Sequence, residues 1–369
     1  MRPTYLEVKL PRLRKNVEAI RAHVAPAGVM AMIKANAYGH GVDGVAPFIE
    51  PYVDYLGVAL PEEGIHLREL GITKPILVAG GTLPEQVRIF ADYDLTLTGS
   101  SIELLEAADD ISRSTGQRIK THLKIDTGME RVGLREYEAE VLVEKSAAYS
   151  HLDVEGIYTH LANSELRDKT YSALQFERFQ EVLSIYEKRS IPVPPLRHVC
   201  NSGGILNLPE AHFDMVRPGI LFYGVYPGDE VDRVVDVEPA VTWRSQVAYS
   251  KIVRPGRPVS YGSLWQPEAE TRIVTIPCGY GDGYFRRMTN RAQIILNGRK
   301  YPQVGRICMD QFMVNVGDDE AHVGDEVVLL GKWDHEQIVA EDLAAWMGTN
   351  EYEVLTSISA RVPRLYLTE

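Results

Sequence analysis

The sequence is poor in cysteine, and this shortage excludes two classes of small-protein scaffold. Its three cysteines, Cys200, Cys278 and Cys308, are odd in number and do not follow metal-ligand spacing. Neither a disulfide framework nor a structural zinc site is therefore indicated. No metal is expected, and the acidic run at 318–320 is interpreted as a solvated turn. A reducing, cytoplasmic location fits this use of cysteine.

The chain also lacks an excess of basic residues and any long apolar run. Its formal net charge is −12 at pH 7, without long runs of one sign, which argues against a nucleic-acid or anionic-membrane surface. No stretch approaches the roughly 20 apolar residues that a transmembrane helix needs. The first residues show no apolar segment typical of a signal peptide. Any anionic ligand must therefore be held by a few placed groups.

What the sequence does have is length and a regular alternation of elements. A chain of 369 residues can bury a large core, and its length suggests two domains or one barrel with an appendage. Up to Arg217, short apolar runs alternate with longer amphipathic ones, as expected of strand and helix units around a parallel sheet. The eight apolar runs are 29–33, 55–60, 75–79, 95–98, 121–125, 154–158, 196–200 and 213–216.

Eight such units in about 200 residues match a (β/α)8 TIM barrel, in which functional groups lie where strands end and loops begin. We predict this α/β barrel over residues 8–228. Helical spacing of apolar residues at 102–107 and 171–179 supports the intervening helices. A doubly wound open sheet is the structural alternative, since periodicity alone does not distinguish the two.

Beyond residue 228 the sequence pattern changes to alternating apolar and polar runs rich in Val, Ile and Thr. This pattern predicts a mainly β domain over residues 229–369, with one helix at 339–347. The predicted strands fall within 240–253, 272–277 and 293–316. The opening run 5–10 also has the pattern of a strand, and residues 1–7 are expected to join the C-terminal sheet.

Lys34 stands at the end of the first predicted barrel strand, directly after an apolar run. A lysine among apolar neighbours loses hydration of its ammonium form, which lowers its pKa and frees the amine to form a Schiff base. The alternative is a strand-end lysine whose charged head reaches water while its stem stays buried. The residues around Lys34 favour the first interpretation.

The segment 29–41, VMAMIKANAYGHG, resembles the cofactor-attachment signature of alanine racemases. The resemblance covers essentially the whole chain, through KIDTGM at 124–129, Arg131, TH at 159–160, NS at 201–202, RPG at 217–219, VSYG at 259–262, GY at 279–280 and CMDQ at 308–311. It implies an isomerase with a barrel and a β domain that uses pyridoxal 5′-phosphate and acts as a head-to-tail homodimer. The implied reaction interconverts L- and D-alanine and supplies D-alanine for peptidoglycan.

The loops after strands seven and eight commonly form a phosphate site in barrels, and here they begin at Asn201 and Arg217. Small residues there let backbone N–H groups approach an anion, although Asn201 also suits a plain helix cap. The resemblance implies that His160 and Asn201 contact the cofactor. It further implies that the phosphate is held by Tyr38, Ser202, Gly219, Ile220 and Tyr352.

Arg217 bears most directly on the type of reaction. By resemblance it faces the pyridine nitrogen of the cofactor, to which a guanidinium can only donate a hydrogen bond. The cofactor then withdraws electrons more weakly, so that return of the proton to Cα is favoured over transamination. A structural arginine before the turn-forming Pro218 is the alternative.

Racemisation removes a proton from one face of Cα and delivers one to the other, so two opposed groups are expected. Lys34 can serve one face, and the resemblance assigns Tyr261 to the other, reaching the cofactor of the partner subunit. A phenol has an unperturbed pKa of about 10, so it needs cationic or hydrogen-bonding help to act as a base. His160 and nearby arginines are candidates for this help. Outside its motif, Tyr261 would be interpreted as a packed strand tyrosine.

The substrate carboxylate suits a bidentate pair with Arg131. By resemblance, a carbamylated Lys124 orients this arginine, the backbone N–H of Met309 also contacts the carboxylate, and Tyr280 lines the entrance. Glu130 stands where the family has glycine, a departure that alters the loop or partly neutralises Arg131.

Three other functions share parts of this pattern. A barrel decarboxylase with the same cofactor is disfavoured by Arg217, because such enzymes resemble one another in placing an acid at the ring nitrogen. A non-catalytic pyridoxal-phosphate carrier does not need the β domain that bears Tyr261. A broad-specificity amino-acid racemase is the nearest alternative, since one methylene changes binding by only about 1–3 kcal/mol.

Overall fold

A computed structural model describes residues 2–369, and the chain divides into two compact units. The barrel unit comprises Leu13–Ala37 and Val42–Glu238. The β unit comprises the N-terminal residues up to Arg12, Tyr38–Gly41 and Pro239–Glu369.

Eight parallel strands form the core of the barrel unit, in the orders β10-β2-β3-β4 and β5-β6-β8-β9. They are β2 (Gly28–Met32), β3 (Tyr55–Val58), β4 (Ile76–Val78), β5 (Leu97–Gly99), β6 (Lys120–Asp126), β8 (Asp153–Tyr158), β9 (Leu196–His198) and β10 (Met215–Val216), with the short β7 (Leu134–Arg135) beside β6. All eight lie within or next to the predicted apolar runs.

The two sheets meet at both edges, which gives the strand order of a barrel. Val78 N–H donates to Thr96 O at 3.1 Å, and Arg217 N–H donates to Cys200 O at 2.9 Å. The ladder is interrupted at these two junctions because the strands that meet there are only two or three residues long. The predicted barrel class is thus confirmed, and the doubly wound sheet is not formed.

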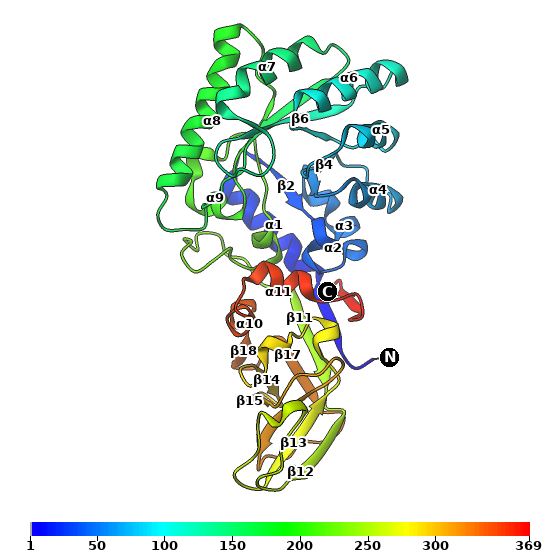
Figure 1. Ribbon diagram of the computed structural model, residues 1–369, viewed down its shortest axis with the longest axis vertical. Coiled ribbons are helices and arrows are strands. Elements are labelled where there is room, and N and C mark those ends of the chain that lie inside the picture. The colour runs from blue at the N-terminus through cyan, green and yellow to red at the C-terminus, as the bar shows by residue number, and fades with distance from the viewer. Residues whose placement is uncertain (1) are drawn as a thin grey trace. The chain divides into compact units, whose positions relative to one another are not determined.

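Helices surround these strands (Figure 1). They are α1 (Leu10–Val24), α3 (Val42–Ile49), α4 (Pro61–Glu69), α5 (Val87–Asp92), α6 (Ile102–Thr115), α7 (Ala139–Ala148), α8 (Thr170–Arg189) and α9 (Ser202–Asn207). The segment labelled α2 (Lys34–Tyr38) is a left-handed turn. The sequence explains the bounds of α6, because Ser101 caps its start by accepting from Leu104 N–H at 3.2 Å. Gly116 ends the helix with φ +72°, a left-handed conformation that glycine adopts easily.

The β unit is built on a ten-stranded sheet with the order β12-β13-β16-β15-β14-β17-β11-β1-β19, in which β18 pairs with β17. Its strands are β1 (Tyr5–Lys9), β11 (Val241–Gln246), β12 (Tyr249–Val253), β13 (Thr271–Ile276), β14 (Gln293–Leu296), β15 (Arg299–Val304), β16 (Phe312–Gly317), β17 (Glu326–Trp333), β18 (Glu336–Ile338) and β19 (Arg364–Leu367). The unit also holds α10 (Ala340–Met347) and α11 (Glu351–Ser357). The mainly β architecture is as predicted, but two helices occur where one was expected.

The N-terminal strand β1 lies between two strands from the far end of the chain. It pairs antiparallel with β11 and parallel with β19. Leu6 and Val8 alternate with partly exposed residues and are buried, as expected of a strand with one face on the core.

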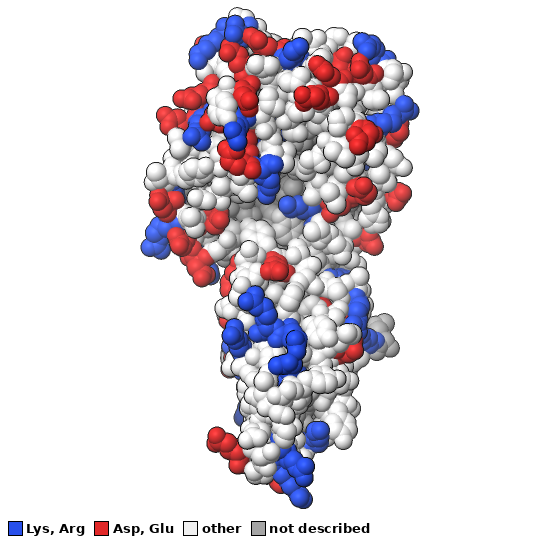
Figure 2. All heavy atoms as spheres, in the orientation of Figure 1, with Lys and Arg blue, Asp and Glu red and all other residues white. Residues whose placement is uncertain are grey.

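The surface of each unit carries charge differently on the face shown in Figure 2. On the barrel unit acidic and basic side chains are mixed, whereas basic side chains gather on part of the β unit. Within residues 2–369, no helix has the length and apolar character to cross a membrane. No cluster of three or more potential metal ligands occurs in the same range.

Candidate active site

Lys34 lies just beyond the carboxyl end of β2, where the backbone takes an uncommon path. The four residues after it, 35–38, have φ between 49° and 55°. Left-handed backbone costs an L residue roughly 1–2 kcal/mol, so other contacts must hold the turn. Glu63 supplies some of them, since its carboxylate accepts from Ala35 N–H at 2.6 Å and Ala59 N–H at 2.8 Å. Strain of this kind is typical of functional sites.

The Lys34 amine is half-buried. Burial lowers its pKa, the nearby charge of Arg131 lowers it further, and Glu63 opposes them in part. The carboxylate of Glu63 is already engaged with backbone N–H groups. A lysine in this setting loses its proton more easily than one in water, which is the condition for nucleophilic chemistry.

Several predicted site residues gather around His160, which follows β8. Burial lowers the pKa of His160 well below its usual value, and four nearby cations add to the effect. These cations are Arg217, Lys124, Arg131 and Lys34. The imidazole is therefore neutral near pH 7 and offers hydrogen bonding rather than charge. The cluster as a whole is positive, which suits an anionic ligand.

Lys124 is the most deeply buried amine of this cluster. Its side chain points into the barrel from β6 and donates to Ile125 O at 2.7 Å. Burial lowers its pKa to about 7, although Asp126 partly opposes the change. A fraction of the amine is thus neutral at pH 7, and only the neutral form can react with carbon dioxide to form a carbamate.

The loop after β6 is organised by the carboxylate of Asp126. Its oxygens accept backbone N–H bonds from the four residues 128–131 at 2.8–3.1 Å. Burial opposes ionisation, but these hydrogen bonds outweigh it and lower the pKa of Asp126. This loop holds the backbone of Arg131, whose charge acts on the pKa of His160.

Glu130 lies in the same loop with φ +53°, the left-handed conformation that glycine adopts at least cost. This conformation fits the glycine that the resemblance implies at this position. Its carboxylate pairs with Arg135 at 2.8 Å. The expected neutralisation of Arg131 by Glu130 is therefore not seen as a contact, and the carboxylate turns to the neighbouring arginine instead.

Arg217 follows β10 and is only 4% exposed. Its guanidinium donates to His198 Nδ1 at 2.8 Å, Thr159 O at 2.8 Å, Val199 O at 3.0 Å and His160 Nδ1 at 3.3 Å. An uncompensated buried charge costs roughly 3–5 kcal/mol, and hydrogen bonds to a charged group contribute about 1.5–3 kcal/mol each. These bonds can hold the charge without a carboxylate. Burial lowers the pKa of Arg217 only to about 10, so it stays protonated at pH 7.

The loops after β9 and β10 are tied together by Ser202. Its hydroxyl accepts from Gly219 N–H at 2.9 Å and Leu221 N–H at 3.3 Å. Asn201 caps α9 by accepting from Gly204 N–H at 3.0 Å, so the helix-cap interpretation of Asn201 is correct for its side chain. Ser202 begins α9, and the first N–H groups of a helix have no partner within it. A Cβ at Gly203 would lie 2.6 Å from Ser164 Oγ, so the loop can pack this closely only with glycine.

The second predicted base, Tyr261, lies in the β unit and is 71% exposed. Its segment has a left-handed backbone at Ser260 (φ +68°), Gly262 (φ +77°) and Ser263 (φ +50°). Ser260 fixes the segment by donating its hydroxyl to Arg306 O at 2.6 Å. Like the turn after Lys34, this segment is strained next to a candidate acid/base residue.

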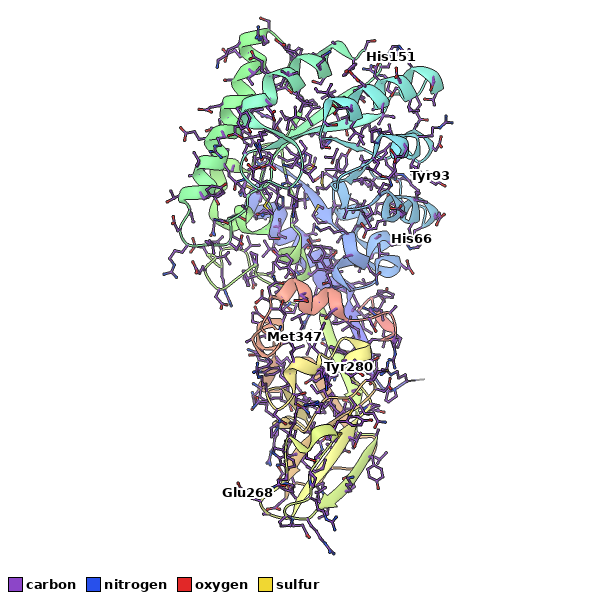
Figure 3. All side chains as sticks on the ribbon, viewed as in Figure 1. His66, Tyr93, His151, Glu268, Tyr280 and Met347 are labelled. Carbon is purple, nitrogen blue, oxygen red and sulfur yellow. The ribbon has the colours of Figure 1, made fainter. Side chains whose placement is uncertain are left out.

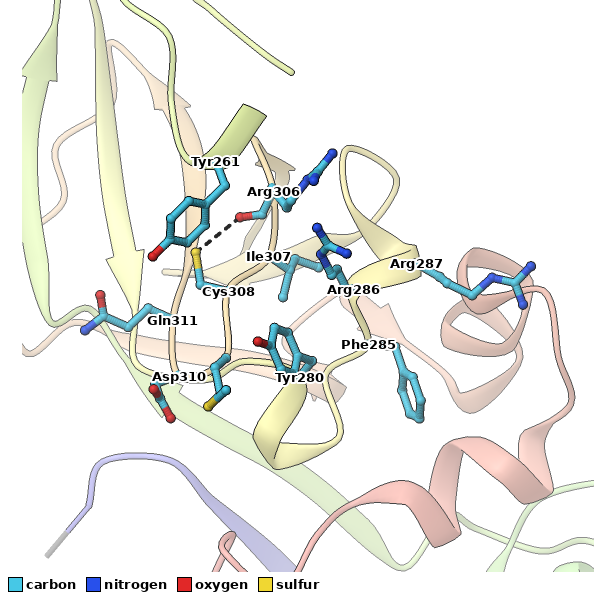
Figure 4. A pocket seen from close by; sticks show the side chains of 11 residues that line it. Tyr261, Tyr280, Phe285, Arg286, Arg287, Arg306, Ile307, Cys308, Asp310 and Gln311 are labelled. Atoms are coloured by element: carbon cyan, nitrogen blue, oxygen red, sulfur yellow. Dashed lines mark hydrogen bonds between the residues drawn. The ribbon is translucent and has the colours of Figure 1, made fainter. Parts of the chain in front are cut away.

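Tyr261 shares an open pocket of the β unit with Tyr280 and Met309, which are the predicted entrance and carboxylate-contacting residues. The two tyrosines lie on either side of Cys308 (Figure 4). Backbone bonds hold the segments together, since Tyr280 N–H donates to Cys308 O at 3.0 Å. Arg306 also lines the pocket, as do Arg286 and Arg287, which were not predicted.

Tyr38 and Tyr352, which the resemblance assigns to the phosphate, both belong to the β unit. Their ring centroids are 6.1 Å apart. Burial raises the pKa of Tyr38 to about 12, so its phenol keeps its hydrogen and can act as a donor. Tyr352 projects from α11 (Glu351–Ser357) and is half-buried.

Sequence reasoning missed a group of buried polar side chains inside the barrel, of which His122 and His198 are fully buried. The sequence signal that could have found them is a histidine within a predicted strand run, His122 in 121–125 and His198 in 196–200. These histidines differ from His66 and His151, which lie on outer parts of the barrel unit (Figure 3) and pair with Asp43 and Asp109.

Comparison with known proteins gives a consistent result. Residues 8–227 match the family model "Alanine racemase, N-terminal domain" and residues 240–366 match "Alanine racemase, C-terminal domain". An alanine racemase of Carboxydothermus hydrogenoformans is 44% identical and covers 100% of both chains. The solved alanine racemase of Clostridium difficile has a TM-score of 0.93 and 36% identity, covering 100% of this chain and 97% of that one. A Bartonella henselae alanine racemase "with covalently bound pyridoxal phosphate" has a TM-score of 0.90 and 27% identity, covering 100% of both chains.

Proposed function

The chain belongs to the alanine racemase family and interconverts L- and D-alanine, and we propose that it does so with pyridoxal 5′-phosphate and two opposed acid/base groups, Lys34 and Tyr261. The observation that carries the proposal is the setting of Lys34. Its amine is half-buried, its pKa is lowered by burial, and it stands among cations at the carboxyl end of the barrel strands.

The residues present fit the cofactor. The Lys34 amine can form its covalent link, and the loops joined by Ser202 offer backbone N–H groups to a phosphate. Asn201, Gly219 and Ile220 belong to the same loops, and His160 lies beside Arg217. By resemblance, Tyr38 and Tyr352 complete the phosphate site. When bound, pyridoxal phosphate supplies an electron sink that makes the Cα–H bond of alanine more acidic. The Bartonella henselae relative, with its covalently bound pyridoxal phosphate, supports this assignment.

Arg217 directs the outcome of proton transfer in this proposal. It keeps its hydrogens at neutral pH, because even its lowered pKa is about 10. It can therefore donate to the ring nitrogen of the cofactor but cannot accept a proton from it. The weaker electron withdrawal that follows favours return of the proton to Cα over transamination, and an acidic residue at this position would have the opposite effect.

The two proton-transfer groups act on opposite faces of the substrate Cα. Lys34 Nζ removes or delivers the proton on one face, and Tyr261 Oη does so on the other. Neutral His160 can help Tyr261 by hydrogen bonding. General acid/base groups of this kind contribute roughly 10²–10⁴-fold to a rate.

We propose that Arg131 binds the substrate carboxylate with help from Lys124 and Met309. Lys124 has a pKa of about 7 among other cations. Carbamylation would replace its positive charge by a negative one and so attract and orient Arg131. The backbone N–H of Met309 would contact the carboxylate, and Tyr280 would line the entrance.

We further propose a homodimer in which Tyr261 reaches the Lys34 site of the partner subunit. The high exposure of Tyr261 and its place in the β unit support this arrangement. A cytoplasmic location is proposed from the three free cysteines. D-Alanine produced there would supply peptidoglycan synthesis.

The experiment that tests the function follows L- and D-alanine separately by NMR in D₂O with purified protein and pyridoxal phosphate. We expect deuterium at Cα together with formation of the opposite enantiomer from either starting compound. Release of CO₂ without interconversion would instead identify a decarboxylase. Borohydride trapping followed by peptide mapping should locate the cofactor on Lys34, and an adduct on another lysine would contradict the assignment.

A further inference from the structure

The barrel interior holds a hydrogen-bonded row of side chains that the proposed reaction does not use directly. Arg217 Nη1 lies 2.8 Å from His198 Nδ1, and His198 Nε2 lies 2.8 Å from His122 Nδ1. His122 Nε2 lies 3.3 Å from Glu155 Oε1. Tyr55 donates its hydroxyl to the same Glu155 oxygen at 2.5 Å. The row therefore has a guanidinium at one end and a carboxylate at the other.

The row runs from the amino-terminal half of β8 to the carboxyl end of β10. Glu155 is the third residue of β8, and its side chain is 22% exposed. His122 and His198 are completely buried, and Arg217 follows the carboxyl end of β10. In barrels the carboxyl end of the strands carries chemistry, whereas the amino end carries stability. The row thus connects the amino-terminal half of the strands, through His122 and His198, to the end that carries chemistry.

The chemistry of its two ends fixes the direction of every hydrogen in the row. A guanidinium has no acceptor, so His198 Nδ1 must accept from Arg217 and His198 carries its hydrogen on Nε2. That N–H donates to His122 Nδ1, which leaves the hydrogen of His122 on Nε2. An ionised carboxylate only accepts, so His122 donates to Glu155. Both ends thus require the same tautomer of both histidines.

The surroundings favour the neutral imidazoles that this arrangement needs. Burial lowers the pKa of His122, although Glu155 opposes the change, and burial together with the charge of Arg217 lowers that of His198. Hydrogen bonds from His122 and Tyr55 outweigh burial and lower the pKa of Glu155, so this carboxylate is ionised.

We propose that Glu155 is a positioning residue for the racemase: by accepting from His122 it sets the tautomers of His122 and His198 and so keeps an acceptor facing Arg217. The assignment of the tautomers stands on the hydrogen-bond geometry alone. The consequence for the reaction rests on the proposed function, in which Arg217 donates to the ring nitrogen.

Removal of the acceptor has a defined consequence. Without Glu155, the Nε2–H of His122 loses its acceptor, and nothing at that end of the row requires the hydrogen on Nε2 any longer. With the hydrogen on Nδ1 instead, His122 would point it at His198 Nε2. Two N–H groups would then face each other between His122 and His198. Relief requires His198 to place its hydrogen on Nδ1, against the Arg217 guanidinium. Arg217 would lose an acceptor and its fixed orientation.

Long-range ¹⁵N–¹H correlation spectra of protein labelled in its histidine rings can read the tautomers directly, with and without pyridoxal phosphate. We expect the hydrogen on Nε2 in both His122 and His198, assigned by the signals that vanish in His122→Gln and His198→Gln. A hydrogen on Nδ1 of either ring in the unaltered protein would overturn the proposal without recourse to any variant.

Two substitutions at Glu155 test the role in catalysis. Glu155→Gln keeps an acceptor oxygen, and we expect the tautomers to be retained and turnover to fall only a few-fold. Glu155→Met removes the acceptor at similar length. We expect it to change the histidine spectrum and to lower turnover by about tenfold or more, as for other groups that orient a functional side chain.

Tyr55→Phe is the matched control, because it removes the other hydrogen bond to Glu155 and leaves the His122 contact in place. Its histidine spectrum should match that of the unaltered protein. If Glu155→Met has the unaltered spectrum and turnover, the proposal is wrong. Failure of the proposed function looks different: the unaltered protein with pyridoxal phosphate then leaves alanine enantiomers unchanged, whatever its histidine spectrum.

Discussion

The candidate residues of the barrel unit (the barrel half) and of the β unit (the β half) lie in very different surroundings. In the barrel unit the reactive groups are buried or half-buried, and burial lowers the pKa of Lys34, Lys124 and Arg217. In the β unit Tyr261 is 71% exposed on an open pocket. The barrel half is tuned by its own fold, because its strands enclose the charges. In the proposed homodimer, Tyr261 takes its chemical environment from the partner subunit.

The two halves nevertheless share one structural feature, a strained backbone next to the candidate reactive residue. Left-handed backbone occurs at residues 35–38 after Lys34 and at Ser260, Gly262 and Ser263 around Tyr261. Each segment is held by hydrogen bonds from outside it, from Glu63 in the first case and through Ser260 to Arg306 O in the second. Rigid placement of the reactive group is thus needed in both halves, whereas desolvation is built into only one.

The largest expected effect is in the barrel half. Lys34→Ala removes both the attachment point and one base, and we expect racemisation to fall by about 10⁴-fold, the upper end for a proton-transfer group. The measurement is interconversion of alanine enantiomers, with Lys145→Ala on the exposed side of α7 as a control that should retain activity. Substantial activity in Lys34→Ala would contradict the role of Lys34.

The matching change in the β half is Tyr261→Phe, for which we expect a loss of roughly 10²–10³-fold with the visible cofactor band retained. One enantiomer should still exchange its Cα hydrogen in D₂O faster than it converts, because Lys34 remains on its face. Tyr249→Phe, another exposed tyrosine of the β unit, should behave like the unaltered protein. Unchanged turnover in Tyr261→Phe would show that two bases are not required.

Mixing the two inactive proteins tests whether the halves meet between subunits. In a mixed dimer of Lys34→Ala and Tyr261→Phe chains, one site receives both intact residues. After dissociation and reassembly, activity should return to roughly a quarter of the unaltered level, since half of the dimers are mixed and each has one intact site. Absence of any recovery, with mixed dimers demonstrated by mass spectrometry, would place both residues of a site in one chain.

A smaller effect is expected from the buried amine of the barrel half. Lys124→Met keeps the length of the side chain and removes the amine, and KM for alanine should rise about tenfold while kcat changes less. Carbamylation needs the neutral amine, so a ¹³C carbamate signal from labelled bicarbonate should grow as the pH rises through about 7. It should be missing in Lys124→Met. If the unaltered protein gives no such signal above that pH, Lys124 acts as a plain amine.

The smallest effect concerns Glu130, on the rim of the barrel half. Glu130→Ala keeps the left-handed strain and loses the exposed pair with Arg135, which contributes little because water screens it. Glu130→Gly loses the same pair but relieves strain of about 1 kcal/mol. Thermal unfolding should therefore show Glu130→Gly to be the more stable of the two. A lowered KM for alanine in both would show instead that Glu130 weakens Arg131.

Much of the fold could be predicted because local patterns of apolar and polar residues indicate its strands and helices. The eight apolar runs correspond to the eight barrel strands, and the alternating runs after residue 228 correspond to the β unit. Residues such as Lys34 and Arg217 could be selected because a parallel barrel brings all carboxyl ends of its strands to one face. The left-handed φ of Glu130 fits the glycine that the resemblance implies there.

The amino-acid sequence by itself determined where the barrel strands fall and the types of the two domains, since these depend on periodicity, and its contiguous motifs supplied the candidate site residues. Only the tertiary structure decided which groups share a dry interior and in which direction their hydrogens point. His122 and His198 are 76 residues apart and meet only because the barrel packs their strands around one core. Burial and donor geometry arise from such distant contacts, and these are the quantities that set the pKa of a lysine or the tautomer of a histidine.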